Sequence, residues 1–256
     1  MSDIGVDGLA DGAAKALLLA FERLLTVGLG VDSPRGEHGT LLITSGIPLP
    51  HLNGVFTDSR EPDVDEVAEF AHRMTESAVP WSIQVRGEPT PELVEVATRF
   101  GLTHRMRLPL MAMPAAPVTF TSDGHAVRTV DGKEHELYRD VLAAGFEAPV
   151  DIMAALAQPE ILDMPGATAY LVEADGEPVS TGFGILVGDH IGVFNISTPP
   201  GHRRRGYGRT ATEAVLRDGY AAGARVAFLQ ASSDGLPLYE LLGFRVVETW
   251  TYLQRG

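Results

Sequence analysis

A short run of arginines and glycines, Arg-Arg-Arg-Gly-Tyr-Gly at residues 203–208, most strongly constrains how this chain can fold. The stretch before it, residues 190–197, is rich in isoleucine, valine and phenylalanine and predicts a β-strand that Pro199 and Pro200 end. After it, apolar residues recur at helical spacing over 210–221 and predict an amphipathic helix. The run therefore lies at a strand-to-helix turn, where free backbone N–H groups and the helix dipole favour an anion.

The composition of this turn suits a phosphate group. Gly206 and Gly208 carry no side chain that would prevent close approach of an anion. The turn is not a P-loop, because the Gly-Lys-Ser/Thr ending is missing. We therefore expect a pyrophosphate cradle built from the backbone N–H groups of residues 204–209, whereas the alternative is a solvated arginine-rich turn. The positive charge comes from Arg203, Arg204, Arg205 and Arg209.

The spacing Arg-x-x-Gly-x-Gly in this run resembles the acetyl-CoA signature of the GNAT acyltransferase superfamily. A second element supports the resemblance. A predicted strand at 224–233 is followed by a short helix that ends in Leu-Tyr-Glu-Leu-Leu-Gly-Phe at 238–244, and by a last strand at 245–253. This order is similar to the C-terminal end of a GNAT domain, and the resemblance covers about residues 125–255.

The resemblance implies roles for several residues. In this superfamily the strand before the cradle splays from its neighbour and binds the pantetheine arm of CoA, which here points to Ile196 and Thr198. A backbone N–H group near Asn195 or Ile196 would face the thioester carbonyl as an oxyanion donor. Tyr239 occupies the position of the superfamily's tyrosine and would protonate the leaving thiolate, since a phenol of pKa about 10 can serve a thiol of pKa about 8.5. The alternative is a tyrosine that only packs.

The expected cofactor-binding residues follow from the same resemblance. Ser233, like Ser232, could contact the pantetheine or cap the next helix, because serine is a favoured helix N-cap. The full set is Ile196, Ser197, Thr198, Arg203, Arg204, Arg205, Gly206, Tyr207, Gly208, Arg209, Thr210 and Ser233.

The base for an acceptor amine is the least determined part of the predicted site. Many GNAT members place a glutamate on the splayed strand, whereas this chain offers Asn195 there. Glu147 and Asp151 lie in the segment that borders the acceptor pocket in this superfamily, and His190 begins the strand. We take Glu147 as the expected base, and the alternatives are Asp151, His190 and a chain of water molecules to solvent.

A faint internal repeat indicates two related halves. Val55 and Val193 lie in similar apolar motifs 138 residues apart, and Gly101 and Gly243 each end a short predicted helix, 142 residues apart. Offsets this similar are expected of a duplicated unit with one small insertion or deletion. The first half has three acidic residues over 57–63, where the cradle would be, so we expect that it does not bind CoA. An unrelated α/β domain is the alternative.

These patterns predict an α/β fold of the α+β mixed-sheet kind. We expect two GNAT-like domains in tandem, each with a mostly antiparallel central sheet flanked by helices. The ranges are 1–115 for a degenerate domain without a CoA cradle, 116–124 for a Pro/Gly-rich linker, and 125–256 for the catalytic domain.

Charge and composition restrict the partners. The net charge of −14 argues against nucleic acid, because neutralisation of phosphates by Lys and Arg supplies most non-specific affinity. The chain has no cysteine, so it offers no disulfide, thiol nucleophile or cysteine-based metal site, and we expect no metal. No apolar run approaches the roughly 20 residues that cross a bilayer, so we expect no membrane partner and a cytoplasmic location.

We therefore expect an acetyl-CoA-dependent N-acetyltransferase, in which acetyl-CoA is the cosubstrate and a small amine attacks it directly. Two alternatives stay open. One is a non-catalytic acyl-CoA-binding sensor, and the other is the same fold used for another acyl-CoA reaction, such as O-acyl transfer or decarboxylation.

Overall fold

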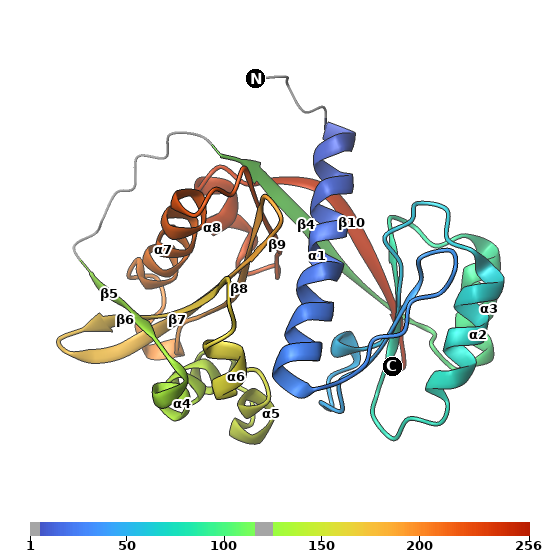
Figure 1. Cartoon of the computed structure of the whole chain (residues 1–256), viewed down its shortest axis with the longest axis horizontal. Coiled ribbons are helices and arrows are strands. Elements are labelled where there is room, and N and C mark those ends of the chain that lie inside the picture. Colours follow the sequence, from blue (N-terminus) through green and yellow to red (C-terminus); the bar gives the residue numbers. More distant parts are fainter. Residues whose placement is uncertain (1–5, 116–124) are drawn as a thin grey trace. The chain divides into compact units, whose positions relative to one another are not determined.

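The structure of this chain is a computed structural model that describes residues 6–115 and 125–256 (Figure 1). The chain divides into two compact units. Unit 1 comprises Met1–Met111, Gln230–Leu236 and Arg245–Gly256, and unit 2 comprises Ala112–Leu229 and Pro237–Phe244. The predicted linker, residues 116–124, lies outside the described residues.

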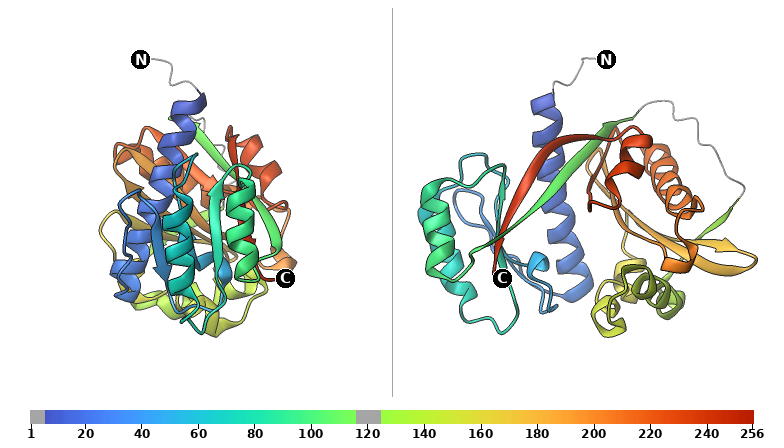
Figure 2. Two further views of the ribbon diagram at one scale, coloured as in Figure 1. Left: turned by 90° about the vertical axis from the view of Figure 1, so that its right-hand side faces the viewer. Right: turned by 180° about the vertical axis from the view of Figure 1, so that it is seen from behind.

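Unit 1 is a mixed sheet with helices packed on it. Its strands follow the order β1-β2-β3-β10-β4, in which β1 and β2 are antiparallel, β2 and β3 are parallel, and β3 and β10 are antiparallel. Helices α2 and α3 lie side by side (Figure 2). The elements are α1 (Val6–Leu29), β1 (Leu41–Thr44), η1 (Pro50–Leu52), β2 (Asn53–Phe56), α2 (Val64–Met74), β3 (Ser82–Arg86), α3 (Pro91–Arg99), β4 (His104–Pro114) and β10 (Arg245–Gln254). The last residues of β4 belong to unit 2.

Local sequence signals set the ends of α2 and α3. The Asp63 carboxylate accepts a hydrogen bond from Glu66 N, and the Thr90 hydroxyl accepts one from Leu93 N, so each helix has a side-chain N-cap. Pro91 occupies the first turn of α3, where a missing N–H is tolerated. The apolar faces of both helices pack against Val55, Ile83 and other buried residues of the sheet.

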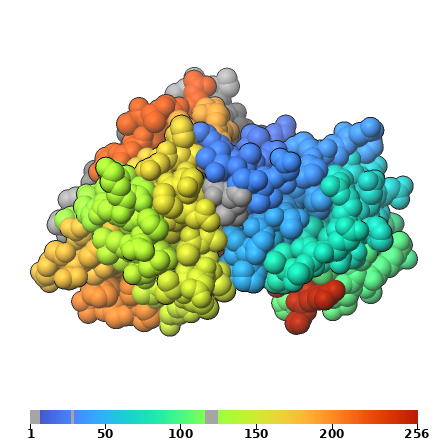
Figure 3. All heavy atoms as spheres, turned by 60° about the horizontal axis from the view of Figure 1, so that its bottom comes forward, coloured from blue at the N-terminus to red at the C-terminus, as the bar shows by residue number. Residues whose placement is uncertain are grey.

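The C-terminal strand, β10, lies in a different unit from the one that we expected. We expected β10 to belong to a domain spanning 125–256, whereas it pairs with β3 and lies in unit 1. Leu253 is buried in the unit 1 core, and Glu248 receives hydrogen bonds of 2.7 and 2.8 Å from Arg86. In Figure 3 the C-terminal end, in red, lies against the green part of unit 1, where a Cβ on Gly256 would be 3.9 Å from His104 Cβ.

The strands of unit 2 follow the order β9-β8-β7-β6-β5. The pairs from β5 to β8 are antiparallel, and β8 and β9 are parallel and joined by α7. The elements are β5 (Ala126–Val130), η2 (Gly132–Glu134), α4 (His135–Phe146), α5 (Val150–Ala154), α6 (Pro159–Leu162), β6 (Ala167–Ala174), β7 (Glu177–Val187), β8 (His190–Ser197), η3 (Pro200–His202), α7 (Tyr207–Ala221), β9 (Val226–Gln230) and α8 (Leu236–Leu241). A mixed sheet flanked by helices confirms the predicted fold class.

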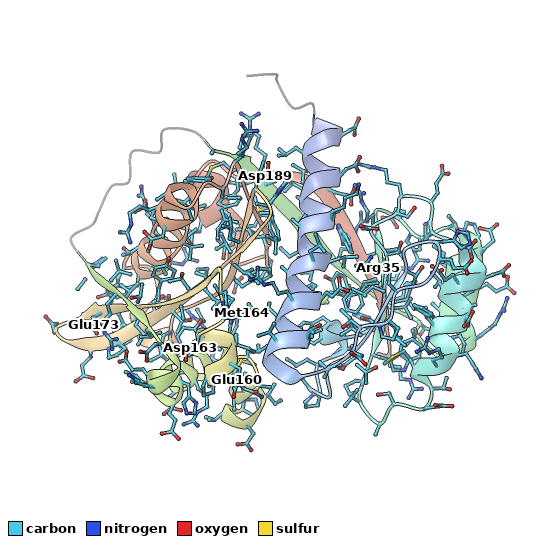
Figure 4. The ribbon with its side chains drawn as sticks, viewed as in Figure 1. Arg35, Glu160, Asp163, Met164, Glu173 and Asp189 are labelled. Atoms are coloured by element: carbon cyan, nitrogen blue, oxygen red, sulfur yellow. The ribbon has the colours of Figure 1, made fainter. Side chains whose placement is uncertain are left out.

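Helices cover both faces of the unit 2 sheet. On one face, close packing of α7 leaves no room for a side chain at Gly184, because a Cβ there would lie 2.8 Å from Val215 Cγ1. On the other face, Tyr138 of α4 donates a hydrogen bond of 3.2 Å to the Gly182 carbonyl of β7. Below the sheet in Figure 4, the Asp163 carboxylate accepts a hydrogen bond of 2.8 Å from Gly132 N and joins the end of α6 to η2.

Candidate functional site

The predicted cradle lies between β8 and α7, as the sequence indicated. Gly206 precedes the first residue of α7 and has φ 89° and ψ −10°, a left-handed conformation that glycine adopts without strain. Among the described residues, no side chain caps this helix. The first N–H groups of a helix lack intrahelical acceptors, so those of residues 207–209 face a position where an anion can bind.

The four arginines of the cradle have different surroundings. Arg204 and Arg205 are exposed beside the start of α7, and Arg204 has φ 64°, which is uncommon for a residue with a side chain. Arg209 donates a hydrogen bond of 2.8 Å to Glu213 one helical turn later. The side chains of Arg204 and Arg205 therefore face solvent beside the N-terminus of α7, the positive end of the helix dipole.

Arg203 joins the cradle to the end of α4. Its guanidinium group donates hydrogen bonds of 3.0 Å to the Thr198 carbonyl, 3.0 Å to the Gly145 carbonyl and 2.7 Å to the Glu147 carboxylate. Glu147 has φ 53° at the C-terminus of α4 and is exposed. Arg203 and Glu147, which were expected to bind the cofactor and to act as the base, thus form an ion pair. Asp151 is exposed in α5.

A histidine that the sequence did not single out contacts the cradle. His125 Nε2 lies 2.9 Å from the Arg205 carbonyl, and its ring centroid is 4.5 Å from that of Tyr207. The Tyr207 side chain is buried against Val179 and Ala211, so it packs, and only its backbone N–H faces the cradle. Thr210 is also buried, and its N–H donates to the Gly206 carbonyl at 2.9 Å.

The strand before the cradle separates from its neighbour. Pairing between β8 and β9 joins His190 to Val226 and ends at Gly192 with Phe228, although β8 continues to Ser197. Among the described residues, the register between β8 and β9 does not continue beyond Gly192 and Phe228. Ile196 and Thr198 are partly exposed at this end. The structure thus has the splayed strand that the resemblance implied, leading directly to the cradle.

A β-bulge lies on this separated part of β8. Between the pairs Thr181–Ser197 and Phe183–Phe194, β8 contains one more residue than β7, and Asn195 has φ 51°. The Thr181 hydroxyl donates a hydrogen bond of 2.7 Å to the Asn195 carbonyl and lies 2.8 Å from the Ser197 hydroxyl. A bulge re-aims the backbone groups next to it, so the N–H groups near Asn195 and Ile196 differ in direction from those of a regular strand.

Further hydroxyl groups form hydrogen bonds to the residues next to the bulge. Ser180 donates a hydrogen bond of 2.7 Å to the Ser197 carbonyl, and its hydroxyl lies 2.9 Å from that of Thr198. Ser180 and Thr181 are completely buried. Ser197 is buried under α4, where a Cβ on Gly145 would overlap its hydroxyl, so its side chain serves the bulge and not an exposed surface.

Tyr138 of α4 is a hydrogen-bond partner of the Asn195 side chain. It is completely buried, and burial raises the pKa of its phenol far above the ordinary value. Its hydroxyl contacts the Gly182 carbonyl, and the Asn195 side chain is a second hydrogen-bond partner. The side chain of Asn195 therefore faces α4, and the backbone of this residue is the part that can face a ligand.

The strand, the bulge and the cradle lie within a segment that matches a known protein family. The family described as the acetyltransferase (GNAT) family matches residues 135–244.

This segment of the chain belongs to the GNAT superfamily.

Solved structures share the fold over a wider range than this segment. They include a GCN5-related N-acetyltransferase from Kribbella flavida, which is 22% identical with a TM-score of 0.70 over 97% of this chain and 96% of that chain. A functionally unknown conserved protein from Staphylococcus epidermidis is 14% identical, with a TM-score of 0.65 over 88% and 93% of the two chains. A GCN5-related N-acetyltransferase from Sphaerobacter thermophilus is 17% identical, with a TM-score of 0.54 over 75% and 67%. No curated protein matches the sequence.

Within this segment, the structure brings α8 to the first turn of α7. A Cβ on Gly208 would lie 3.7 Å from Leu238 Cδ2, and Leu238 precedes Tyr239. Tyr239 is buried with its ring edge-on to Phe244 at 5.9 Å, and burial raises the pKa of its phenol to about 12. A phenol with this pKa is protonated at neutral pH, so Tyr239 is a hydrogen-bond donor and not a base.

Three other predicted residues have different surroundings. His190 begins β8, where its Nδ1 lies 2.8 Å from the carboxylate of Asp189, labelled in Figure 4. Five residues of strand, about 16 Å, separate it from Asn195, so it does not reach the bulge. The Ser232 hydroxyl accepts a hydrogen bond of 3.2 Å from Gly235 N, which supports the capping interpretation for this residue. Ser233 is exposed in segment Gln230–Leu236 of unit 1.

Residues 6–115 and 125–256 contain no group of three or more His, Asp or Glu side chains that could hold a metal ion. In the same ranges, every helix is too short or too polar to span a bilayer.

Proposed function

We propose that this protein is an acetyl-CoA-dependent N-acetyltransferase that acts on a small amine. The observation that carries the proposal is the adjacency of two features in unit 2, the end of β8 beyond its last pair with β9 and the uncapped, glycine-flanked start of α7. The end of β8 suits an extended arm that carries amide groups, and the start of α7 suits a pyrophosphate. Acetyl-CoA has both groups in this order.

The cradle would hold the pyrophosphate. The backbone N–H groups of residues 204–209 would donate to the phosphate oxygens, and Arg204 and Arg205 would add charge-assisted hydrogen bonds. Arg203 would act indirectly, since its guanidinium group already binds Thr198, Gly145 and Glu147.

The pantetheine arm would extend from the cradle along the end of β8, beyond its last pair with β9. Its two amide groups would pair with the strand as an added strand would, and Ile196 and Thr198 are the predicted contacts. The bulge would direct a backbone N–H near Asn195 or Ile196 at the thioester carbonyl, where negative charge develops as the amine attacks.

The reaction would proceed by direct attack. The nitrogen lone pair of the amine forms a bond to the thioester carbon, and the carbon–sulfur bond breaks as the tetrahedral intermediate collapses. Tyr239 donates its phenolic proton to the sulfur, and the amine loses its proton to Glu147 or through water. Glu147 is exposed, so it can exchange a proton with solvent.

The acceptor and the location follow from charge and composition. A net charge of −14 would favour a small cationic amine over an anionic acceptor. We propose a cytoplasmic location, where acetyl-CoA is plentiful. The first half, residues 1–115, would be a degenerate GNAT-like domain that binds no CoA, and 125–256 would contain the catalytic residues.

Thiol release from acetyl-CoA with a panel of amines tests the proposal, together with calorimetry of CoA binding. We expect one CoA per chain and thiol release that depends on an amine. CoA binding without release for any acceptor would indicate the acyl-CoA sensor, and release with alcohols or with malonyl-CoA alone would indicate O-acyl transfer or decarboxylation. A stoichiometry of two CoA molecules would contradict the degenerate first half.

A further inference from the structure

His125 binds the loop of the cradle from a distant part of unit 2. It precedes β5, and its Nε2 lies 2.9 Å from the carbonyl oxygen of Arg205. A carbonyl oxygen can only accept a hydrogen bond, so Nε2 carries the hydrogen and donates it. The loop that leads into α7 therefore receives a side-chain hydrogen bond from outside its own sequence motif.

The position of the His125 ring is set by the core of unit 2. The ring centroids of His125 and Tyr207 are 4.5 Å apart, with an interplanar angle of 52°. The Tyr207 side chain is itself buried and packs against Val179 and Ala211. The imidazole thus rests on a ring that the core holds, and its donor is directed at the Arg205 carbonyl.

The peptide group between Arg205 and Gly206 has two accessible orientations. Gly206 has φ 89°, and a rotation of this peptide by half a turn would bring φ to about −90°, which glycine adopts as readily. Across a trans peptide the carbonyl and the N–H group point in opposite directions. The rotation would therefore place the Arg205 carbonyl oxygen where the Gly206 N–H group now lies.

One of these orientations suits an anion and the other does not. In the observed orientation the Gly206 N–H group points away from His125, and no acceptor for it is present in residues 6–115 and 125–256. The preceding residue, Arg204, has φ 64°, a conformation that costs free energy in a residue with a side chain and persists where surrounding contacts maintain it. The hydrogen bond from His125 is such a contact.

We propose that His125 positions the cradle, because its hydrogen bond keeps the Gly206 N–H group, and not the Arg205 carbonyl, directed at the pyrophosphate of CoA. This inference rests on the proposed function and adds to it a positioning residue outside the Arg-x-x-Gly-x-Gly motif. His125 acts only through the backbone of the loop. It therefore affects the affinity for CoA and leaves the chemical step unchanged.

Two substitutions of His125 test this role. His125→Phe keeps a ring against Tyr207 and removes the donor, so CoA and acetyl-CoA should both bind about 3- to 10-fold more weakly, the net worth of one hydrogen bond. KM for acetyl-CoA should rise by the same factor, while kcat at saturating acetyl-CoA is unchanged. His125→Gln carries an N–H donor near the position of Nε2 and should restore most of the affinity. His72→Phe, at an exposed histidine of α2 in unit 1, is the control and should bind CoA as the wild type does.

The outcomes separate this inference from the proposed function. If the wild-type protein binds CoA and His125→Phe binds it equally well, or if His125→Gln restores nothing, the inference is wrong and the function stands. If the wild-type protein binds no CoA, the proposed function is wrong, and the NMR signal of the Gly206 amide in the ligand-free protein decides the inference. That signal should change in His125→Phe and return in His125→Gln, and an unchanged signal in His125→Phe would contradict the positioning role.

Discussion

The Thr181 hydroxyl donates a hydrogen bond of 2.7 Å to the Asn195 carbonyl and joins two strands at the only described residue of β8 with a positive φ. The carbonyl of a bulged residue has no partner in the regular ladder, so a side chain must satisfy it when it is buried. Thr181 is completely buried and performs this role. It lies on β7, so it acts on the ligand only through the backbone of β8.

Replacement of Thr181 by valine tests the role of this bond. Thr181→Val keeps the shape of the side chain but leaves the Asn195 carbonyl without a donor, and we expect the bulge to shift. The preference for acetyl-CoA over CoA should fall, since only acetyl-CoA has the thioester carbonyl, and turnover should fall at least about tenfold. Thr181→Ser restores the hydroxyl and should restore both. Unchanged preference and turnover in a folded Thr181→Val protein would mean that the bulge does not position the thioester.

A glycine substitution in the cradle tests the anion site. Gly208 is the better position, because Gly206 has φ 89° and any side chain there would strain the backbone by about 1–2 kcal/mol. A Cβ on Gly208 has only ordinary contacts, the nearest being Thr198 Oγ1 at 3.6 Å. Gly208→Glu should therefore fold and lose CoA affinity by at least about a hundredfold, through a negative charge where phosphate would bind. Gly208→Ala controls for volume, and equal CoA affinity in all three proteins would disprove the cradle.

Tyr239 can be tested by removal of its hydroxyl alone. Tyr239→Phe keeps the edge-on contact with Phe244, so stability should change little. If the phenol protonates the thiolate, turnover should fall by about 10²–10⁴ while CoA affinity is preserved. Since burial raises the pKa of this phenol to about 12, its proton is present at all pH values below about 11, and the wild-type rate should show no loss from phenol ionisation up to pH 10. Near-full turnover in Tyr239→Phe would make the residue a packing residue.

Glu147 has two possible roles that one substitution distinguishes. Glu147→Gln removes the charge and keeps an oxygen that can accept the hydrogen bond from Arg203. If Glu147 is the base, turnover at saturating acetyl-CoA should fall by about 10² or more, with CoA affinity retained. If CoA affinity falls while turnover at saturating acetyl-CoA persists, the residue instead holds Arg203 and the cradle in place. Asp151→Asn, on the neighbouring exposed carboxylate, is the matched control.

Much of unit 2 could be predicted because its signals are local. The predicted strand 190–197 has the bounds of β8, since the alternation of residues acts within a few positions. The position of the cradle could also be predicted, because its arginines and glycines are contiguous in the sequence.

The remaining features depend on distant partners. Ser180 and Thr181 are small polar residues in a strand, and only the bulge opposite them explains their burial. His125 is 80 residues from its partner Arg205, and no motif connects the two. The local pattern of β10 predicts a strand but not its neighbour, because the residues that pair with it on β3 lie more than 160 positions earlier.

The buried ion pair between Arg86 and Glu248 offers a direct test of how β10 is held in unit 1. Their side chains are 3% and 8% exposed, and the shortest of their contacts is 2.7 Å. Glu248→Ala leaves the Arg86 guanidinium buried with Asp11 at 2.6 Å as its remaining carboxylate. Removal of one partner of a buried pair costs about 3–5 kcal/mol, and the contact with Asp11 places the expected loss at the lower end.

Urea unfolding measures this loss against a matched surface pair. Glu95→Ala removes an exposed ion pair with Arg99 and should cost no more than about 0.5 kcal/mol. If β10 is part of unit 1, Glu248→Ala should also increase hydrogen exchange in β3 and β10 together, because the pair joins these strands, while the amides of β6 and β7 in unit 2 keep their protection. A loss of protection confined to unit 2 would instead assign the C-terminal strand to the domain that the sequence predicted for it.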